Sequence, residues 1–200
     1  MNIADLRKSY EKAELSEGAS EANPLKQFER WLNEAIQSEV PEPNAMTLAT
    51  VDERGQPSAR IVLIKGFDER GFVFFTNYGS RKARQIAENP HAALLFPWVA
   101  LARQIEIAGP VEKISAAESL TYFLSRPVGS RLGAWVSDQS QVISSRNVLL
   151  TKYEELKKKF ADGEIPKPDF WGGYRVIPET IEFWQGGGDR LHDRFLYAKK

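Results

Sequence analysis

The chain has 200 residues, enough for one domain with a sizeable core, and 27 Lys and Arg residues balance 27 Asp and Glu residues. Zero net charge argues against a general nucleic-acid binder, because such proteins rely on a surplus of basic side chains. The chain has no cysteine and only two, well-separated histidines, which excludes disulfides and thiol catalysis and predicts no metal site. It also lacks a run of about 18 apolar residues and a signal-peptide core, so we expect a cytoplasmic protein.

The N-terminal part of the chain divides at Pro24. Residues 1–23 are polar and rich in Glu, Ala and Ser, and taken alone they predict a mobile N-terminal segment. From Pro24 onward, apolar side chains such as Phe28 and Trp31 recur at helical spacing, and Pro24 suits the first turn of a helix. We therefore expect a single domain over residues 24–200 that opens with a helix packed on a sheet.

The next part of the chain is typical of strands joined by short turns, which pair antiparallel. A capping box at Ser115-Ala-Ala-Glu118 predicts a short helix through Phe123, and a charged amphipathic helix is expected over 144–161. Residues 126–141, which include two glycines and a proline, are expected to form a loop. Six to eight antiparallel strands with a few helices indicate an α+β fold with a barrel-like sheet. The expected strands lie at residues 46–51, 58–65, 72–76, 91–98, 103–108, 173–176 and 180–185.

The stretch Phe183–Arg194 contains a Gly-Gly-Gly-Asp turn signal between two short extended segments. Beyond the turn, Arg190, His192 and Arg194 occupy alternate positions, which would place all three on one face of a strand. Such side chains repel one another unless an anion lies between them, and Trp184 would supply an aromatic wall on the facing strand. The alternative is a solvated edge strand protected by charge.

A second pair of cations brackets the apolar run Arg60-Ile-Val-Leu-Ile-Lys65. Arg60 and Lys65 have opposite parity, so a regular strand would send them to opposite faces. Either the strand ends or bulges before Lys65, or the two side chains serve different ligands. The alternative is that both mark the solvent ends of a core strand.

A third cluster of cations lies at a predicted helix start. Ser80 is a suitable N-cap for a helix that runs to about Glu88. Arg81 and Lys82 then fall in the first turn, where the helix dipole disfavours each cation by about 0.3–1 kcal/mol. A phosphate bound at this helix start would make the two cations favourable, because it would accept from the free N–H groups and pair with both side chains. Cations where the helix dipole disfavours them therefore indicate a functional site.

A series of motifs rich in basic, aromatic and glycine residues follows along the chain: Arg60-Ile-Val-Leu-Ile-Lys65, Phe75-Thr-Asn-Tyr-Gly-Ser-Arg-Lys82, Ser125-Arg-Pro127, Gly133-Ala-Trp-Val-Ser-Asp-Gln-Ser140, Phe170-Trp-Gly-Gly-Tyr-Arg175, and Phe183-Trp-Gln-Gly186 with Arg190-Leu-His-Asp-Arg194. In this order they resemble the pyridoxamine 5'-phosphate oxidase family, from about Arg7 to Tyr197. The resemblance implies an FMN-binding split barrel that works as a homodimer, with FMN at the subunit interface.

The resemblance also implies which residues bind each ligand. Cofactor contacts fall on Arg60, Ile61, Val62, Leu63, Ile64, Lys65, Phe75, Thr76, Arg81, Lys82, Gln104, Gln139, Ser140, Trp184 and Arg194. Substrate contacts fall on Arg7, Lys8, Ser9, Tyr10, Lys65, Tyr122, Arg126, Ser130, Arg190, Leu191 and His192. Within the second set, residues 7–10 resemble a segment that covers bound substrate. The substrate phosphate is assigned to Lys65, Tyr122, Arg126 and Ser130, and the catalytic positions to Arg190 and His192. Trp135 and Trp171 are interpreted as packing residues.

The activity implied is oxidation of pyridoxamine 5'-phosphate or pyridoxine 5'-phosphate to pyridoxal 5'-phosphate, with dioxygen as acceptor and hydrogen peroxide as by-product, in vitamin B6 biosynthesis and salvage. Two phosphates, one on each ligand, would account for clustered cations in a chain of zero net charge. The alternatives are another FMN split-barrel reductase, which would lack the second phosphate site, and a non-catalytic flavin or pyridoxal-phosphate carrier. Two departures from the family pattern are Phe75, where Tyr is common, and an end at Lys200, where a further strand usually follows.

Overall fold

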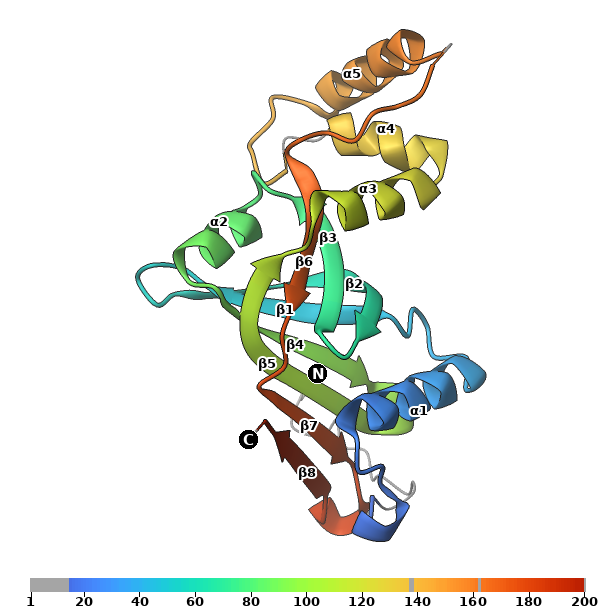
Figure 1. Ribbon diagram of the computed structural model, residues 1–200, viewed down its shortest axis with the longest axis vertical. Helices are drawn as coiled ribbons and strands as arrows, with labels where there is room; N and C mark the ends of the chain where they lie inside the picture. Colours follow the sequence, from blue (N-terminus) through green and yellow to red (C-terminus); the bar gives the residue numbers. More distant parts are fainter. Residues whose placement is uncertain (1–14, 137–138, 162, 200) are drawn as a thin grey trace, which may run out of the picture.

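The computed structural model describes residues 15–136, 139–161 and 163–199 (Figure 1). None of the helices in these ranges is long and apolar enough to span a membrane. The described strands are β1 (Ala45–Val51), β2 (Pro57–Asp68), β3 (Gly71–Asn77), β4 (His91–Trp98), β5 (Arg103–Lys113), β6 (Trp171–Val176), β7 (Thr180–Gln185) and β8 (Asp193–Ala198). The described helices are α1 (Pro24–Gln37), α2 (Arg81–Glu88), α3 (Ala116–Ser125), α4 (Val128–Val136) and α5 (Arg146–Lys159), with 3-10 turns η2 (Glu17–Ala19), η3 (Val99–Leu101) and η4 (Gly188–Arg190).

The strands form one antiparallel sheet that closes on itself. The order β4-β1-β2-β3-β6-β5 makes a ring, because β4 also pairs with β5. Besides β4, strand β5 pairs with two further strands. Its residues 103–108 pair with β7, and its residues 111–113 pair with β6. The β7–β8 hairpin thus extends beyond the barrel, at the end of the molecule opposite α3, α4 and α5 (Figure 1). The predicted α+β fold with a split antiparallel barrel is confirmed.

The core lies inside the barrel and under α1. Helix α1 begins as expected at Pro24, and the Asn23 side chain caps it by accepting from the backbone N–H groups of residues 25 and 26. On its inner face Phe28 is fully buried and meets Phe72 and Phe96 edge to face at 5.0 and 5.1 Å between ring centres. Such aromatic contacts add roughly 0.5–1.5 kcal/mol beyond burial, so α1 is firmly fixed to the barrel.

The loop expected over residues 126–141 is a wrong prediction, because α4 spans Val128–Val136. Two glycines in this stretch oppose a helix by about 1 kcal/mol each. The helix forms nonetheless because Leu132 and Ala134 are buried in a small second core with Phe123 and Trp171. Tertiary burial therefore outweighs local propensity here.

The strand expected after the glycine turn also begins later than predicted. Residues 188–190 form the 3-10 turn η4, in which Asp189 and Arg190 adopt left-handed φ angles of 51° and 64°, and β8 begins only at Asp193. The prediction that Arg190, His192 and Arg194 share one face of a strand is therefore wrong: of the three, only Arg194 lies on it. The period-two pattern gave no sign of the two left-handed residues.

Candidate functional site

A cavity of about 250 Å³ opens on the barrel wall between β2, β3, the start of α2, and α3. It is lined by cationic, aromatic and amide side chains: Arg60, Ile61, Val62, Leu63, Lys65, Phe75, Thr76, Lys82, Tyr122, Arg126, Gln139 and Trp171. All of these except Trp171 were predicted as ligand contacts from the sequence. Ile64, also predicted, is instead turned into the core and is 5% exposed. We refer to this cavity as the anion pocket, for the reasons that follow.

Both cations of the β2 run reach the anion pocket. The pairing of β2 with β3 shifts register between Ile64 and Gly66, which is the bulge that the parity of Arg60 and Lys65 required. Lys65 lies at this bulge and, like Arg60, lines the anion pocket, whereas Ile64 stays buried. One of the sequence alternatives, a strand that bulges before Lys65, is thus confirmed.

Arg60 is fixed in the anion pocket by uncharged acceptors. Its Nη1 donates to Thr50 Oγ1 at 2.6 Å and to the Leu48 carbonyl at 3.0 Å, and its Nη2 donates to Gln85 Oε1 at 3.2 Å. Burial lowers the pKa of Arg60, and the positive charge of Arg81 lowers it further. Gln85 follows Lys82 by about one turn of α2, so both side chains lie on the buried face of this helix, from which Gln85 Oε1 reaches the Arg60 guanidinium.

Lys82 is held in the same way. Its Nζ donates to Gln139 Oε1 at 2.9 Å and to Thr76 Oγ1 at 3.2 Å. Burial, followed by repulsion from Arg60, lowers the pKa of Lys82 to about 8. Among the described residues no carboxylate forms a salt bridge with Lys82 or Arg60, so within this part of the chain the charges of these two side chains are not neutralised by an ion pair.

The helix start beside Lys82 has the predicted N-cap. The Ser80 side chain accepts from the Ala83 N–H, and Ser140 Oγ accepts from the Arg81 N–H at 3.2 Å. The Arg81 side chain is exposed and lines a neighbouring hollow with Arg84 rather than the anion pocket. The structure therefore brings Gln139 and Ser140 to the start of α2. The Arg81 side chain lies outside the anion pocket, so Arg81 acts on this site through its backbone N–H and its positive charge.

The opposite wall of the anion pocket is aromatic. Phe75 and Tyr122 stack with ring centres 3.9 Å apart, and the Arg126 guanidinium lies 4.7 Å from the centre of the Trp171 ring. Burial lowers the pKa of Arg126, and its buried Nη1 has no hydrogen-bond partner among the described residues. Arg126 also lines the cavity, and a guanidinium group there is suited to an anionic oxygen. Ser130, on α4, is exposed and does not line the cavity.

The remaining predicted residues that the structure describes lie elsewhere, on β5 and the β7–β8 hairpin. Gln104, Trp184 and Arg194 are register partners across the three strands. The His192 ring lies 4.9 Å from that of Trp184, and its Nδ1 accepts from the Gly187 N–H at 3.1 Å.

The turn before His192 requires glycine at one position. A Cβ at Gly187 would meet the Leu191 carbonyl oxygen at 2.0 Å, so only glycine permits this close turn. Arg190 and Leu191 are exposed, and none of the hairpin residues lines the anion pocket. Within the described part of a single chain, the predicted ligand residues of the hairpin therefore do not meet those of the anion pocket.

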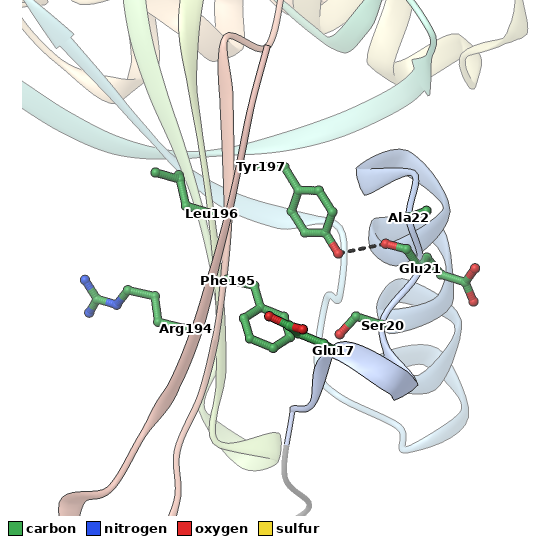
Figure 2. A pocket seen from close by; sticks show the side chains of 8 residues that line it. All are labelled: Glu17, Ser20, Glu21, Ala22, Arg194, Phe195, Leu196 and Tyr197. Carbon is green, nitrogen blue, oxygen red and sulfur yellow. Dashed lines mark hydrogen bonds between the residues drawn. The ribbon is translucent and has the colours of Figure 1, made fainter. Parts of the chain in front are cut away.

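A second hollow, of about 410 Å³, lies beside β8 and is shown in Figure 2. Its walls are Arg194 to Tyr197 of β8 and the segment Glu17 to Ala22, joined by the hydrogen bond from Tyr197 Oη to the Glu21 carbonyl at 2.7 Å. Arg194 is the one predicted ligand residue among its lining residues, which also include the acidic residues Glu17 and Glu21. The predicted substrate-covering residues Arg7, Lys8, Ser9 and Tyr10 lie outside the described residues.

Sequence reasoning missed three residues at the anion pocket: Thr50, Gln85 and Trp171. Trp171 was interpreted as packing, and it does pack on Phe123, but it also lines the cavity and supports Arg126. Gln85 could have been found from helical spacing, since it shares a face with Lys82. Thr50 was missed because its contact with Arg60 runs diagonally between paired strands and depends on the register of β1 with β2.

The closed antiparallel barrel with an anion pocket on its wall places the protein in the class of FMN-binding split-barrel folds. Two solved structures share the fold. PhzG from Burkholderia lata 383, in complex with tetrahydrophenazine-1-carboxylic acid, superposes with a TM-score of 0.86 at 31% identity, covering 92% of this chain and 90% of that chain. A pyridoxamine 5'-phosphate oxidase-related, FMN-binding protein from Nostoc punctiforme has a TM-score of 0.71 at 18% identity, covering 89% of this chain and 92% of that one.

The sequence comparisons are more specific. Residues 32–160 match the family model for pyridoxamine 5'-phosphate oxidase, and residues 171–200 match that for the pyridoxine 5'-phosphate oxidase C-terminal dimerisation region. The pyridoxine/pyridoxamine 5'-phosphate oxidase of Aliarcobacter butzleri is 60% identical over 200 residues, covering 100% of this chain and 94% of that protein. The protein of the same name from Crocosphaera subtropica is 60% identical over 198 residues, covering 99% and 92%. The chain belongs to the pyridoxamine 5'-phosphate oxidase family, which confirms the resemblance seen in the sequence.

Proposed function

We propose that the protein is an FMN-dependent oxidase that converts pyridoxamine 5'-phosphate, or pyridoxine 5'-phosphate, to pyridoxal 5'-phosphate in vitamin B6 biosynthesis and salvage. With the amine substrate, water and dioxygen are consumed, and ammonia and hydrogen peroxide are released. The observation that carries the proposal is the anion pocket, in which two separately held groups of cations lack carboxylate partners among the described residues. Two phosphorylated ligands would fit these two groups.

One group would hold the FMN phosphate. Arg60 and Lys82 line the cavity, and Lys82 and Arg81 belong to the first turn of α2. Thr76, Gln139 and Ser140 supply further hydrogen-bonding groups. Helix N-termini and charge-assisted hydrogen bonds both favour phosphate. When bound, FMN supplies the ring that accepts hydride from the substrate.

The other group would hold the substrate phosphate. Arg126, Lys65 and Tyr122 all line the same cavity. Stacking of Arg126 on Trp171 fixes the plane of the guanidinium, which favours directed recognition of phosphate over a loose ionic contact. Ser130 would join this group only through a shift of α4.

The hairpin residues would reach the ligands from a second subunit. Gln104, Trp184, Arg190, His192 and Arg194 are apart from the anion pocket of their own chain, and the match to a dimerisation region supports a homodimer with shared sites. Arg190 would hold the substrate and stabilise charge that develops as hydride leaves, and His192 would position the ring. No general base is assigned. Light scattering that shows a monomer with full FMN occupancy would contradict the homodimer.

The proposed activity is tested by peroxide release from the FMN-loaded protein on addition of pyridoxamine 5'-phosphate. Pyridoxamine without phosphate is the matched control, since the Arg126 group predicts that the phosphate is needed for efficient turnover. This control also matters because the Burkholderia lata relative was solved with a ligand whose name includes no phosphate. A split-barrel reductase would leave pyridoxamine 5'-phosphate unoxidised but oxidise a nicotinamide donor, and a carrier would bind flavin or product and release no peroxide.

A further inference from the structure

The polar side chains beneath the anion pocket form a connected network without charge of their own. Thr50 and Gln85 are 1% and 3% exposed, and Thr50 Oγ1 donates to Gln85 Oε1 at 2.7 Å. Gln85 Nε2 in turn donates to Ser58 Oγ at 3.1 Å, which fixes the amide so that its oxygen faces Arg60. The Arg60 guanidinium thus donates to Thr50 Oγ1 and Gln85 Oε1. Both oxygens are held in place by hydrogen bonds within the network.

Two other enclosed arginines of the described residues, Arg175 and Arg103, are held by carboxylates instead. Arg175 lies 3.0 Å from a carboxylate oxygen of Glu118 and 3.5 Å from one of Glu112, and Arg103 pairs with Glu34. A carboxylate at the place of Gln85 would bind Arg60 more strongly, since ionic hydrogen bonds are about twice as strong as neutral ones. It would also neutralise the charge that an anion in the pocket requires. The buried amide of Gln85 therefore orients the Arg60 guanidinium without neutralising its positive charge.

We propose that Gln85, supported by Thr50, is a positioning residue that aims Arg60 into the anion pocket and keeps its charge available, and thereby sets the preference for a phosphorylated flavin over an unphosphorylated one. This rests on the proposed function, in which the ligand beside Arg60 and Lys82 is the FMN phosphate. Gln85 does not line the cavity and acts only through Arg60.

The test is titration of the flavin-free protein with FMN and with riboflavin, followed by quenching of flavin fluorescence. In Gln85→Glu a carboxylate keeps the acceptor beside Arg60 but cancels its charge. FMN affinity should fall roughly tenfold or more, as expected for loss of a charge-assisted contact, while riboflavin affinity should change by less than about twofold. Thermal unfolding of the flavin-free variant should show no loss of stability, because the introduced carboxylate would form an ion pair with Arg60.

Gln56→Glu is the control for net charge, since Gln56 is exposed in the β1–β2 turn and its side-chain amide donates to the Pro57 carbonyl. It should leave both affinities unchanged. If Gln85→Glu does not fold, Thr50→Val provides the second test, because it removes one neutral acceptor of Arg60 at nearly constant volume. A loss of about threefold or more in FMN affinity, without a loss for riboflavin, is then expected.

Two outcomes would overturn the proposal while leaving the proposed function intact. One is an unchanged ratio of FMN to riboflavin affinity in Gln85→Glu. The other is an equal loss for both flavins together with lower thermal stability, which would make Gln85 a purely structural residue. A wild-type protein that does not prefer FMN to riboflavin would instead refute the cofactor assignment itself, and this inference with it.

Discussion

The anion pocket and the β7–β8 hairpin both carry predicted ligand residues, but the chain holds them in different ways. In the anion pocket, Arg60 and Lys82 are fixed by hydrogen bonds to neighbouring side chains. On the hairpin, Leu191 is 80% exposed, and Arg194 is also exposed and reaches Glu182 only at 3.6 Å. One region is organised by its own chain, whereas the other presents its side chains outward. The difference indicates that the hairpin residues become a site only against another surface.

The anion pocket and the hairpin also differ in how much free energy it costs to keep their basic side chains charged. In the anion pocket, burial and then repulsion from Arg60 lower the pKa of Lys82 to about 8, so its positive charge is disfavoured there. A bound phosphate would remove this penalty, so binding energy and folding energy are linked in this region. The hairpin carries its charges in solvent, where the cost is small. Substitutions in the two regions should therefore affect different steps.

The largest effect is expected from Lys82→Ala, which removes a charge-assisted contact to the FMN phosphate. Such contacts contribute about 1.5–3 kcal/mol, so FMN affinity should fall by roughly ten- to a hundredfold, with little change in the Michaelis constant at saturating FMN. Titration of the flavin-free protein measures this. Lys26→Ala, on the exposed face of α1, is the control. Normal FMN affinity in Lys82→Ala would show that the start of α2 is only a solvated helix end.

Arg190→Met should affect the reaction rather than the cofactor. Methionine keeps an apolar stem and removes the charge, so the protein should remain folded and yellow. Flavin reduction by pyridoxamine 5'-phosphate should slow by roughly tenfold or more, which is about 1.4 kcal/mol or above in the barrier. Anaerobic single-turnover reduction is the measurement. A wild-type rate and affinity would make Arg190 an ordinary surface charge.

The pH dependence of FMN binding should follow Lys82. Its pKa of about 8 in the flavin-free protein means that the ammonium is charged at pH 7 and loses its proton as the pH rises through 8. FMN affinity should therefore be constant from about pH 6.5 to 7.5 and fall by roughly tenfold by about pH 9. Lys82→Ala should lack this fall.

Stability of the flavin-free protein should move in the opposite direction. The folded pKa of Lys82 lies below its unfolded value of 10.5, so its charge destabilises the fold below about pH 8. That penalty is relieved between about pH 8 and 10.5, and the wild type should gain stability relative to Lys82→Ala over this range. A parallel loss of affinity and stability would contradict the assignment to Lys82.

A mixed dimer tests whether the two regions meet across subunits. Co-expression of Lys82→Ala and Arg190→Met chains with different tags allows the heterodimer to be purified. If each site combines the anion pocket of one chain with the hairpin of the other, one site of the two is intact and about half of the wild-type turnover returns at limiting FMN. If each site were built within one chain, the heterodimer would be as impaired as the two parent proteins.

The sequence predicted the pocket region better than the hairpin region, for a physical reason. The motif Arg60–Lys65 lies within β2, and the opposite parity of its two cations made a bulge one of the alternatives that the sequence predicted. The hairpin turn depends on left-handed angles at Asp189 and Arg190, and an arginine gives no sequence signal for this conformation. Contacts between elements distant in sequence were also missed, such as that of Gln85 with Arg60. Helix α4 escaped prediction because its stability comes from burial against Trp171 and not from its own glycine-containing sequence.

The smallest effect is expected at the network that fixes α3, which carries Tyr122 and Arg126 into the anion pocket. Glu118 caps α3 by accepting from Ser115, and its Oε1 contacts Arg175 Nη2 at 3.0 Å. These hydrogen bonds, first that of the Ser115 side chain and then that of Arg175, lower the pKa of Glu118 to about 2. The hairpin has no comparable network among its described residues, so this network sharpens the contrast between the two regions.

Glu118→Gln keeps the cap but removes the charge beside buried Arg175. Since Glu118 itself is 36% exposed, solvent screening limits the loss of unfolding free energy to about 1 kcal/mol at pH 7. The folded pKa of Glu118 lies below its unfolded value of 4.5, so its contribution is complete above about pH 4.5 and is lost as the pH falls toward 2. Urea unfolding at a series of pH values should therefore show the two proteins converging in acid, whereas Glu155→Gln, on the exposed part of α5, should match the wild type throughout. A difference that persists unchanged to about pH 2 would mean that the Glu118 carboxylate acts through packing and not through its charge.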